Sequence, residues 1–250
     1  MKVFAVLCTS LGLLVACGGG SANTPAGSPA PPAALIKYQN TLPGLNATGT
    51  IDLTQNVIDF GPGAASVVHV HTTPNLATVL AGQITIKIPA GDKHATQGQM
   101  LVEPVNQPLQ AVNTGSGETM VVVAFAVPHG AKPTAPVAGK PAPAVPNKTL
   151  YTFTFASPSI SGAYSIVQQI QVFVPGAETP KQRMGGPAVI TVIQGTVIEN
   201  VDGVERTFGT GESFTEVPGQ TLRTFNQAST QAVLAATFLL PDGAQLTKNA

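Results

Sequence analysis

Short apolar runs separated by turn-forming residues dominate the hydrophobic pattern of this chain. Residues 77–80, 84–88 and 120–127 are such runs, and glycine, proline, asparagine or aspartate interrupts the pattern every several residues. No segment keeps the 3.6-residue period of an amphipathic helix. In residues 196–208, apolar positions alternate around Asp202-Gly203, a dipeptide that favours a tight hairpin turn. The pattern therefore predicts an all-β protein whose many short strands form a sandwich or a small barrel.

The same frame of residues occurs twice, with a constant offset of 113 positions. Residues 63–82 correspond to residues 176–195, and the register already holds at Tyr38, which matches Tyr151. A unit of about a hundred residues is too long for a solenoid repeat and has the size of a small domain. The sequence therefore indicates that one domain has been duplicated within the chain.

The duplication sets the expected domain boundaries. We predict a first β-domain in residues 36–131 and a second in residues 149–250. Residues 132–148 between them are rich in proline and have the composition of a stiff extended spacer.

The first residues have the pattern of an export signal. Lys2 precedes an apolar segment, residues 3–15, which is too short to span a membrane. The sequence that follows, Ala16-Cys17-Gly18, resembles a bacterial lipobox. The resemblance implies that residues 1–16 are removed as a signal peptide and that Cys17 is lipidated. An ordinary signal peptide that contains a cysteine is the alternative.

Lipidation would make this an exported protein, anchored to the bacterial cell envelope by membrane lipid on Cys17. Residues 17–35 are rich in glycine, proline, alanine and serine, and we expect them to form a flexible tether. Cys8 would leave with the signal peptide, so thiol catalysis is excluded.

Charge argues against nucleic acid as a partner. The 250-residue chain has 12 Lys and Arg against 12 Asp and Glu, and charged residues make up only 10% of it. Such a chain offers no basic face to a phosphate backbone.

Two histidines carry the candidate chemistry of the chain. His69 and His71 are two residues apart, so in a strand both rings lie on one face. The valines around them favour a strand over a helix. In the second copy the same positions are Gln182 and Met184. The sequence therefore contains one candidate metal site and a second copy that has lost it.

The spacing of Gly63, His69, His71 and Gly82 resembles the first motif of the cupin superfamily. The internal duplication resembles its two-domain members, the bicupins. The resemblance implies two tandem jelly-roll-like β-barrels. It also implies a divalent transition metal held by three imidazoles and one carboxylate, but Asn75 stands at the carboxylate position.

The second cupin motif is also incomplete, because Leu109 occupies the position of the third histidine. The resemblance further implies which side chains line the two barrel interiors. They are Asn75, Thr78, Leu109 and Asn113 in the first domain, and Gln182, Met184, Thr191, Leu222 and Asn226 in the second.

Glu103 is the carboxylate nearest to Leu109 in the sequence. Because Glu216 matches it in the copy without histidines, we interpret Glu103 as a structural or surface residue. The pair His69 and His71 is then an incomplete metal site, and no residue is assigned to catalysis.

The sequence therefore favours a non-catalytic envelope lipoprotein that binds an unknown small molecule or has a structural role, with no cofactor. One alternative is a metal-dependent oxidoreductase of the dioxygenase type, which uses the partial site of the first domain and a divalent transition metal. The second alternative is an interaction module for another envelope protein.

Overall fold

The computed structural model describes residues 30–157 and 159–250, and in these residues every regular element is a β-strand. The prediction of an all-β protein is thus confirmed. Within the same residues no helix has the length and apolar character needed to cross a membrane. The predicted signal peptide, residues 1–16, and the lipidation site Cys17 lie outside the described residues, as does most of the predicted tether.

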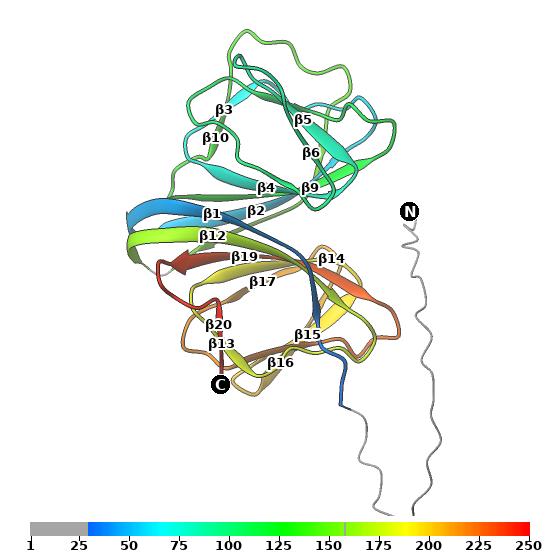
Figure 1. The fold of residues 1–250 in the computed structure, drawn as a ribbon, viewed down its shortest axis with the longest axis vertical. Helices are drawn as coiled ribbons and strands as arrows, with labels where there is room; N and C mark the ends of the chain where they lie inside the picture. The colour runs from blue at the N-terminus through cyan, green and yellow to red at the C-terminus, as the bar shows by residue number, and fades with distance from the viewer. Residues whose placement is uncertain (1–29, 158) are drawn as a thin grey trace, which may run out of the picture. The chain divides into compact units, whose positions relative to one another are not determined.

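The strands form two layered barrels (Figure 1). In what we call the first barrel, the sheets have the strand orders β11-β2-β9-β4-β7, β6-β5-β8 and β10-β3. Its strands are β2 (Ile51–Phe60), β3 (His69–His71), β4 (Asn75–Ala81), β5 (Gln83–Lys87), β6 (Lys93–Thr96), β7 (Met100–Leu101), β8 (Gln110–Val112), β9 (Thr119–Pro128), β10 (Thr134–Pro136) and β11 (Lys148–Ala156).

The second barrel has two sheets with the orders β1-β12-β19-β14-β17 and β16-β15-β18-β13-β20. Its strands are β1 (Leu35–Gly49), β12 (Ile160–Phe173), β13 (Gln182–Met184), β14 (Ala188–Gln194), β15 (Thr196–Val201), β16 (Val204–Gly209), β17 (Ser213–Glu216), β18 (Leu222–Phe225), β19 (Ala232–Pro241) and β20 (Thr247–Asn249).

The predicted hairpin is the connection between β15 and β16. Asp202 and Gly203 both have positive φ, 51° and 91°, as a two-residue type I′ turn requires. The prediction made from the Asp-Gly dipeptide is confirmed.

The two repeats exchange their first strands. β1 comes from the first repeat but pairs with β12, so that Asn40 lies opposite Gln168. β11 comes from the second repeat but pairs with β2, so that Phe153 lies opposite Gln55. Each barrel therefore contains one strand from the other repeat, and the boundaries 36–131 and 149–250 describe the repeat in the sequence rather than the sheets.

The exchanged strand also packs back onto its own repeat. The ring of Tyr38, on β1, lies against Gly98, where a Cβ would be only 2.7 Å from the Tyr38 Cε1 atom. Tyr151 and Gly211 repeat this contact at the same 2.7 Å. With φ of +85° and +89°, these glycines meet both a conformational and a steric requirement.

The five-stranded sheets of the two barrels pack against each other. One buried apolar cluster takes side chains from both, among them Leu53 and Leu76 of the first barrel and Ile166 and Leu239 of the second. Inside this interface, the Gln55 amide donates to the Thr191 hydroxyl at 2.8 Å and accepts from the Thr237 hydroxyl at 2.5 Å. Because a buried amide must be satisfied, this network favours a single alignment of the sheets.

The proline-rich segment, residues 132–148, lies along the first barrel. Its strand β10 pairs antiparallel with β3. The backbone NH groups of Val137 and Asn147 donate to the oxygens of Val68 and Ala65. A proline lacks only its own NH group, so the residues between prolines remain free to pair.

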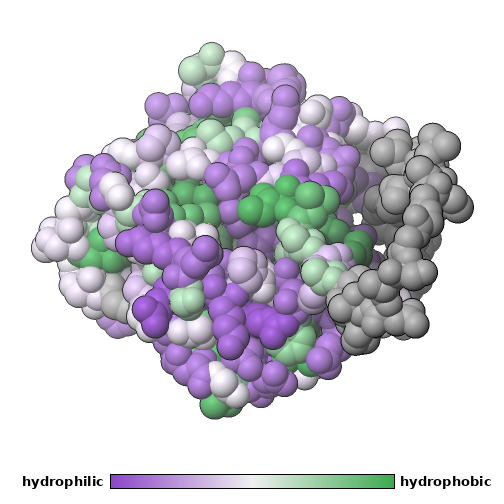
Figure 2. Space-filling view, turned by 60° about the horizontal axis from the view of Figure 1, so that its bottom comes forward, coloured by the Kyte–Doolittle hydropathy of each residue, from purple (hydrophilic) through white to green (hydrophobic). Residues whose placement is uncertain are grey.

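Exposed apolar side chains do not point to a function. On the face shown in Figure 2, hydrophobic residues occur in separate groups among hydrophilic ones. Leu35, Ile36 and Val204 are exposed in the described part of the chain. Single exposed apolar residues are common on protein surfaces, so they do not identify a docking site.

The strand exchange can be tested with disulfides in a chain freed of its native cysteines. Thr54 and Thr154 are paired across β2 and β11, with their hydroxyl oxygens 2.8 Å apart. We expect the double variant T54C/T154C to form a disulfide, since directly opposed strand residues have suitable geometry. The variant T41C/T54C is the control, because Thr41 faces Val167 and would meet Thr54 only without exchange. Non-reducing electrophoresis and peptide mass spectrometry distinguish the two outcomes.

Candidate metal centre in the first barrel

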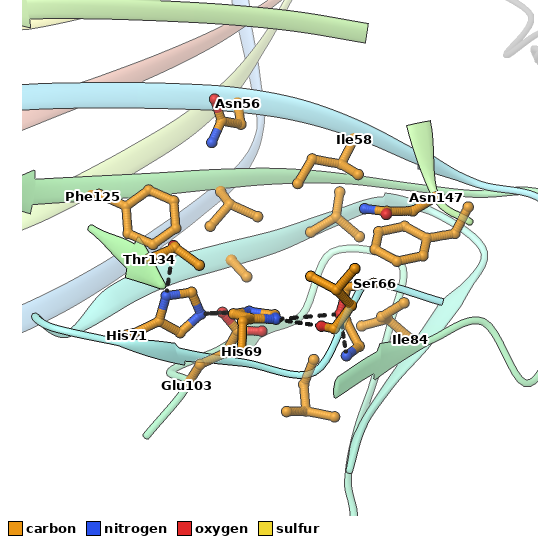
Figure 3. A pocket seen from close by; sticks show the side chains of 17 residues that line it. Asn56, Ile58, Ser66, His69, His71, Ile84, Glu103, Phe125, Thr134 and Asn147 are labelled. Atoms are coloured by element: carbon orange, nitrogen blue, oxygen red, sulfur yellow. Dashed lines mark hydrogen bonds and ion pairs between the residues drawn. The ribbon is translucent and has the colours of Figure 1, made fainter. Parts of the chain in front are cut away.

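Strand β3 directs two imidazoles into the first barrel. His69 and His71 are 8% and 2% exposed, while Val70 between them is half-buried, as the alternation of a strand requires. The rings meet edge to face, with their centroids 4.7 Å apart. The prediction that both rings share one face is confirmed (Figure 3).

Each ring is held by its Nδ1 atom. His69 Nδ1 lies 2.7 Å from the backbone oxygen of Val67, and a carbonyl oxygen can only accept, so this nitrogen donates. His71 Nδ1 lies 3.1 Å from the hydroxyl of Thr134, on strand β10. The two Nε2 atoms then face each other at 3.1 Å. Such partners on Nδ1 are what orient the metal-binding nitrogen of a histidine ligand.

Glu103 joins this group and is buried, so it is not the surface residue that the sequence allowed. It follows β7, is 6% exposed, and places Oε2 2.8 Å from His71 Nε2. The same oxygen accepts a 2.6 Å hydrogen bond from the amide of Asn75. Position 103 thus places a carboxylate beside the two imidazoles, and Asn75 orients it.

The pKa shifts of Glu103 and His69 are in the direction that metal ligation needs. Burial alone raises the pKa of the Glu103 carboxyl, but its hydrogen bond to His71, the charge of His71 and the contact with Asn75 outweigh burial and lower that pKa. Burial lowers the pKa of His69. An ionised carboxylate and a neutral imidazole are the forms that ligate a metal.

The geometry also fits a metal ion. The three ligand atoms lie within 4.8 Å of one another. Nitrogen and oxygen ligands bound at 2.0–2.2 Å and at right angles would be about 3 Å apart. The separations of 3.1 Å and 2.8 Å agree with this value. Two histidines and one carboxylate form the facial triad of non-haem iron sites, and imidazole and carboxylate also suit Mn(II).

A cavity of about 320 Å³ opens beside the three ligands. Ser66, Thr134, Asn56 and Asn147 contribute polar groups to its wall (Figure 3). The rest of the wall is apolar and consists of Ile58, Phe60, Val67, Ala77, Ile84, Ile86, Ala111, Val121, Val123 and Phe125.

The four residues expected to line this interior are buried, but they are not on the wall of the cavity. Asn75 contacts the cavity group through Glu103. Thr78 accepts a hydrogen bond from Asn40, and Leu109 is buried and exchanges backbone hydrogen bonds with His69. The Asn113 amide donates to the backbone oxygens of Phe60, Gly61 and Gly117, and so fixes a turn.

The second barrel has less open space at the corresponding place. Two separate spaces lie beside Gln182 and Met184, one of about 160 Å³ and one of about 10 Å³. Ile190 and Leu234 line the smaller one, where the first barrel has Ala77 and Val121. Larger side chains therefore narrow the inner part of this interior. Among its described residues, the second barrel contains no group comparable to the His69, His71 and Glu103 cluster.

The other residues expected in the second interior have structural positions. Leu222 is buried and lies opposite Gln182. Asn226 repeats the role of Asn113, since its amide donates to the oxygens of Phe173 and Thr230. Thr191 belongs to the interface between the barrels, where it binds Gln55.

Two buried acids occupy the second barrel instead of a metal group. Glu216 matches Glu103, and Glu199 stands where the first barrel has Ile86. Burial raises the pKa of Glu199 to about 7, although Thr224 donates to it at 2.5 Å. Burial and the charge of Glu199 raise the pKa of Glu216. Without a cation beside them, these acids are more stable when protonated.

This acid pair predicts a pH-dependent stability. A carboxyl whose pKa is higher in the folded than in the unfolded chain stabilises fully below about pH 4.5, and this contribution is lost as pH rises through about 7. The loss for Glu199 is about 3 kcal/mol. We expect Glu199→Gln to gain stability relative to the natural chain between pH 5 and pH 8, as measured by urea unfolding. The exposed Glu205 offers the control Glu205→Gln, and equal behaviour of the two variants would contradict the prediction.

Comparison of the sequence with family models and with curated proteins gives no match. The structure, however, resembles several solved proteins. AerE from Microcystis aeruginosa matches with a TM-score of 0.53 and 15% identity, over 82% of this chain and 98% of that chain. Oxalate decarboxylase from Bacillus subtilis, described with Mn(II) centres, matches with a TM-score of 0.54 and 14% identity, over 86% of this chain and 80% of that chain.

A single-residue variant of the same decarboxylase gives a TM-score of 0.56 at 14% identity, over 86% of this chain and 80% of that chain. At such low identity the likeness shows the fold alone. The chain therefore has the fold of the cupin-family proteins it resembles, and its first barrel contains a candidate metal-binding group.

Proposed function

We propose that the first barrel is a metal-dependent cupin centre with oxidoreductase activity, of the dioxygenase type, on a small organic molecule. This was the alternative expectation from the sequence. It is now favoured over a non-catalytic lipoprotein because Glu103 supplies the carboxylate that the motifs lack. In this proposal the second barrel is a structural partner.

The observation that carries the proposal is the convergence of two imidazole nitrogens and one carboxylate oxygen. His71 Nε2 lies 3.1 Å from His69 Nε2 and 2.8 Å from Glu103 Oε2. A proton on His71 Nε2 can bridge to these two neighbours, whereas a metal ion would bind all three atoms as ligands.

In such a centre, some residues would bind the metal and others would orient these ligands. His69, His71 and Glu103 would hold the metal, while Thr134 and Asn75 keep two of these ligands in orientation. When bound, a redox-active metal would supply electron transfer and activate the substrate or dioxygen. Three protein ligands leave coordination positions for molecules from the cavity, and the apolar wall limits competition from water.

The first test is metal content after loading purified protein with Mn(II) or Fe(II). We expect stoichiometric metal in the natural chain and none in His69→Ala/His71→Ala. Glu103→Gln should weaken binding at least tenfold, about 1.4 kcal/mol. Its matched control is Glu216→Gln, the same change at the equivalent position of the second barrel, which should leave binding unchanged. Mass spectrometry of the metal gives the stoichiometry, and the EPR signal of free Mn(II) gives the affinity.

Equal losses in Glu103→Gln and Glu216→Gln would show that the group in the first barrel is not the site. A natural chain that takes up no metal after loading would contradict the proposal as a whole.

We also propose that the chain is exported and anchored to envelope lipid through Cys17. The lipobox-like sequence and the apolar segment before it support this location. We expect mass spectrometry of the N-terminal peptide to find diacylglycerol on Cys17, and Cys17→Ser to move the protein from the membrane to the soluble fraction. An unmodified Cys17 in membrane-bound protein would refute the anchor.

A further inference from the structure

We propose that the second barrel binds a small organic cation, a primary ammonium group on a short apolar body, beside the buried carboxyl group of Glu216. The inference goes beyond the proposed function, which concerns the metal centre of the first barrel and gives the second barrel a structural part. It rests on two neighbouring spaces, on the charges of their walls, and on the donors that Glu216 lacks.

The two spaces lie inside the second barrel, near strands β13 and β20 (Figure 1). The outer one measures about 160 Å³ and the inner one about 10 Å³. The same side chains line both and form the boundary between them, namely Gln171, Thr179, Gln182, Met184 and Phe238. A space of the inner size holds about one water molecule, and an ammonium group is of similar size. The outer space has room for a short alkyl chain.

The charges of the walls favour a cation. Among the described residues that line the two spaces, the charged side chains are two acids, Glu178 and Glu216, and none is a lysine, arginine or histidine. Glu178 forms an ion pair with Arg223, which balances its charge. Glu216 lines the inner space and is 3% exposed, and a second buried acid, Glu199, lies near enough to raise its pKa. A cation beside this pair would stabilise the ionised form.

The carboxyl group of Glu216 also lacks the donors that the equivalent carboxylate of the first barrel has. There, Asn75 donates to the carboxylate and His71 Nε2 lies 2.8 Å away. Ala188 and Met184 stand at these two positions in the second barrel, and neither side chain can donate a hydrogen bond. The Oε2 atom of Glu216 has no hydrogen-bond partner among the described residues. An ammonium group in the inner space would bring donors and a positive charge to this carboxyl group together.

The other lining side chains suit an ammonium group on an apolar body. The amide oxygens of Gln171 and Gln182 can accept hydrogen bonds from it. Phe214 and Phe238 add aromatic rings, whose faces attract cations. Apolar side chains on the outer wall, among them Ile36 and Leu246, would contact the body of the ligand.

The test compares three probes with a common short alkyl body: n-butylammonium, which is a cation and a donor, 1-butanol, which is neutral, and the anion butyrate. Tetramethylammonium is a fourth probe, a cation that has no NH group. Affinities are measured by calorimetry and NMR on the whole chain after treatment with chelator, so that the metal centre of the first barrel does not contribute. We expect n-butylammonium to bind at least tenfold more tightly than each of the other three.

Two variants locate the binding. Glu216→Gln removes the charge and keeps the shape of the side chain, and it should weaken n-butylammonium at least tenfold. Its control is Glu205→Gln, the same change at an exposed position, which should leave the affinity unchanged. Ala236→Val narrows the inner space with the side chain that the first barrel has at the equivalent Val123, and it should abolish binding. Thermal unfolding checks that the variants are folded.

The inference is overturned if 1-butanol, butyrate or tetramethylammonium binds as tightly as n-butylammonium. It is also overturned if folded Glu216→Gln keeps the natural affinity, or if Glu205→Gln loses as much affinity as Glu216→Gln, which would indicate attraction to the surface charge alone. Because the chain is free of metal in these measurements, their outcome does not depend on the proposed function of the first barrel.

Discussion

The pairing of β1 with β12 and of β11 with β2 is the constraint on which the structure depends. Each pairing satisfies a sheet edge that would otherwise expose a row of unpaired NH and carbonyl groups. Because the two exchanged strands cross between repeats, the five-stranded sheets are brought together and share one apolar core. Tyr38 then contacts Gly98 of its own repeat although its strand belongs to the other barrel. The two repeats are therefore held together both by backbone hydrogen bonds between strands and by side-chain packing.

The two barrels use one backbone frame for different interiors. The turn held by Asn113 recurs with Asn226, so the frame does not depend on what the barrel contains. The contents depend on a few side chains. Small residues such as Ala77 leave space beside the imidazoles, whereas Ile190 narrows the equivalent space. A carboxylate is ionised beside His71 and Asn75 in one barrel, and its counterpart meets only another buried acid in the other.

The fold was largely predictable because it depends on local signals. Strand alternation predicted that both histidines lie on one face, and the Asp202-Gly203 dipeptide predicted a type I′ turn. The spacing of glycines and histidines, which resembles the cupin motif, predicted a β-barrel. Such signals are short in the sequence and do not depend on distant contacts.

The site and the strand exchange could not be predicted in the same way. Glu103 reaches His71 through tertiary packing, and its repetition as Glu216 resembled a structural residue. The available signal was indirect: an amide at position 75, which can donate to a carboxylate, replaced the expected carboxylate. The exchange left no mark in the sequence, because both repeats offer the same strand edge and either could accept the strand.

The strand exchange has a consequence for how the two interiors can change. Each repeat sends out its first strand and completes its sheet with the other copy, which is the arrangement of an intertwined homodimer within one chain. In a homodimer every substitution would change both interiors at once. In a single chain each interior can change by itself, so one carries the larger Ile190 and Leu234 while the other carries two imidazoles, a carboxylate and a larger cavity.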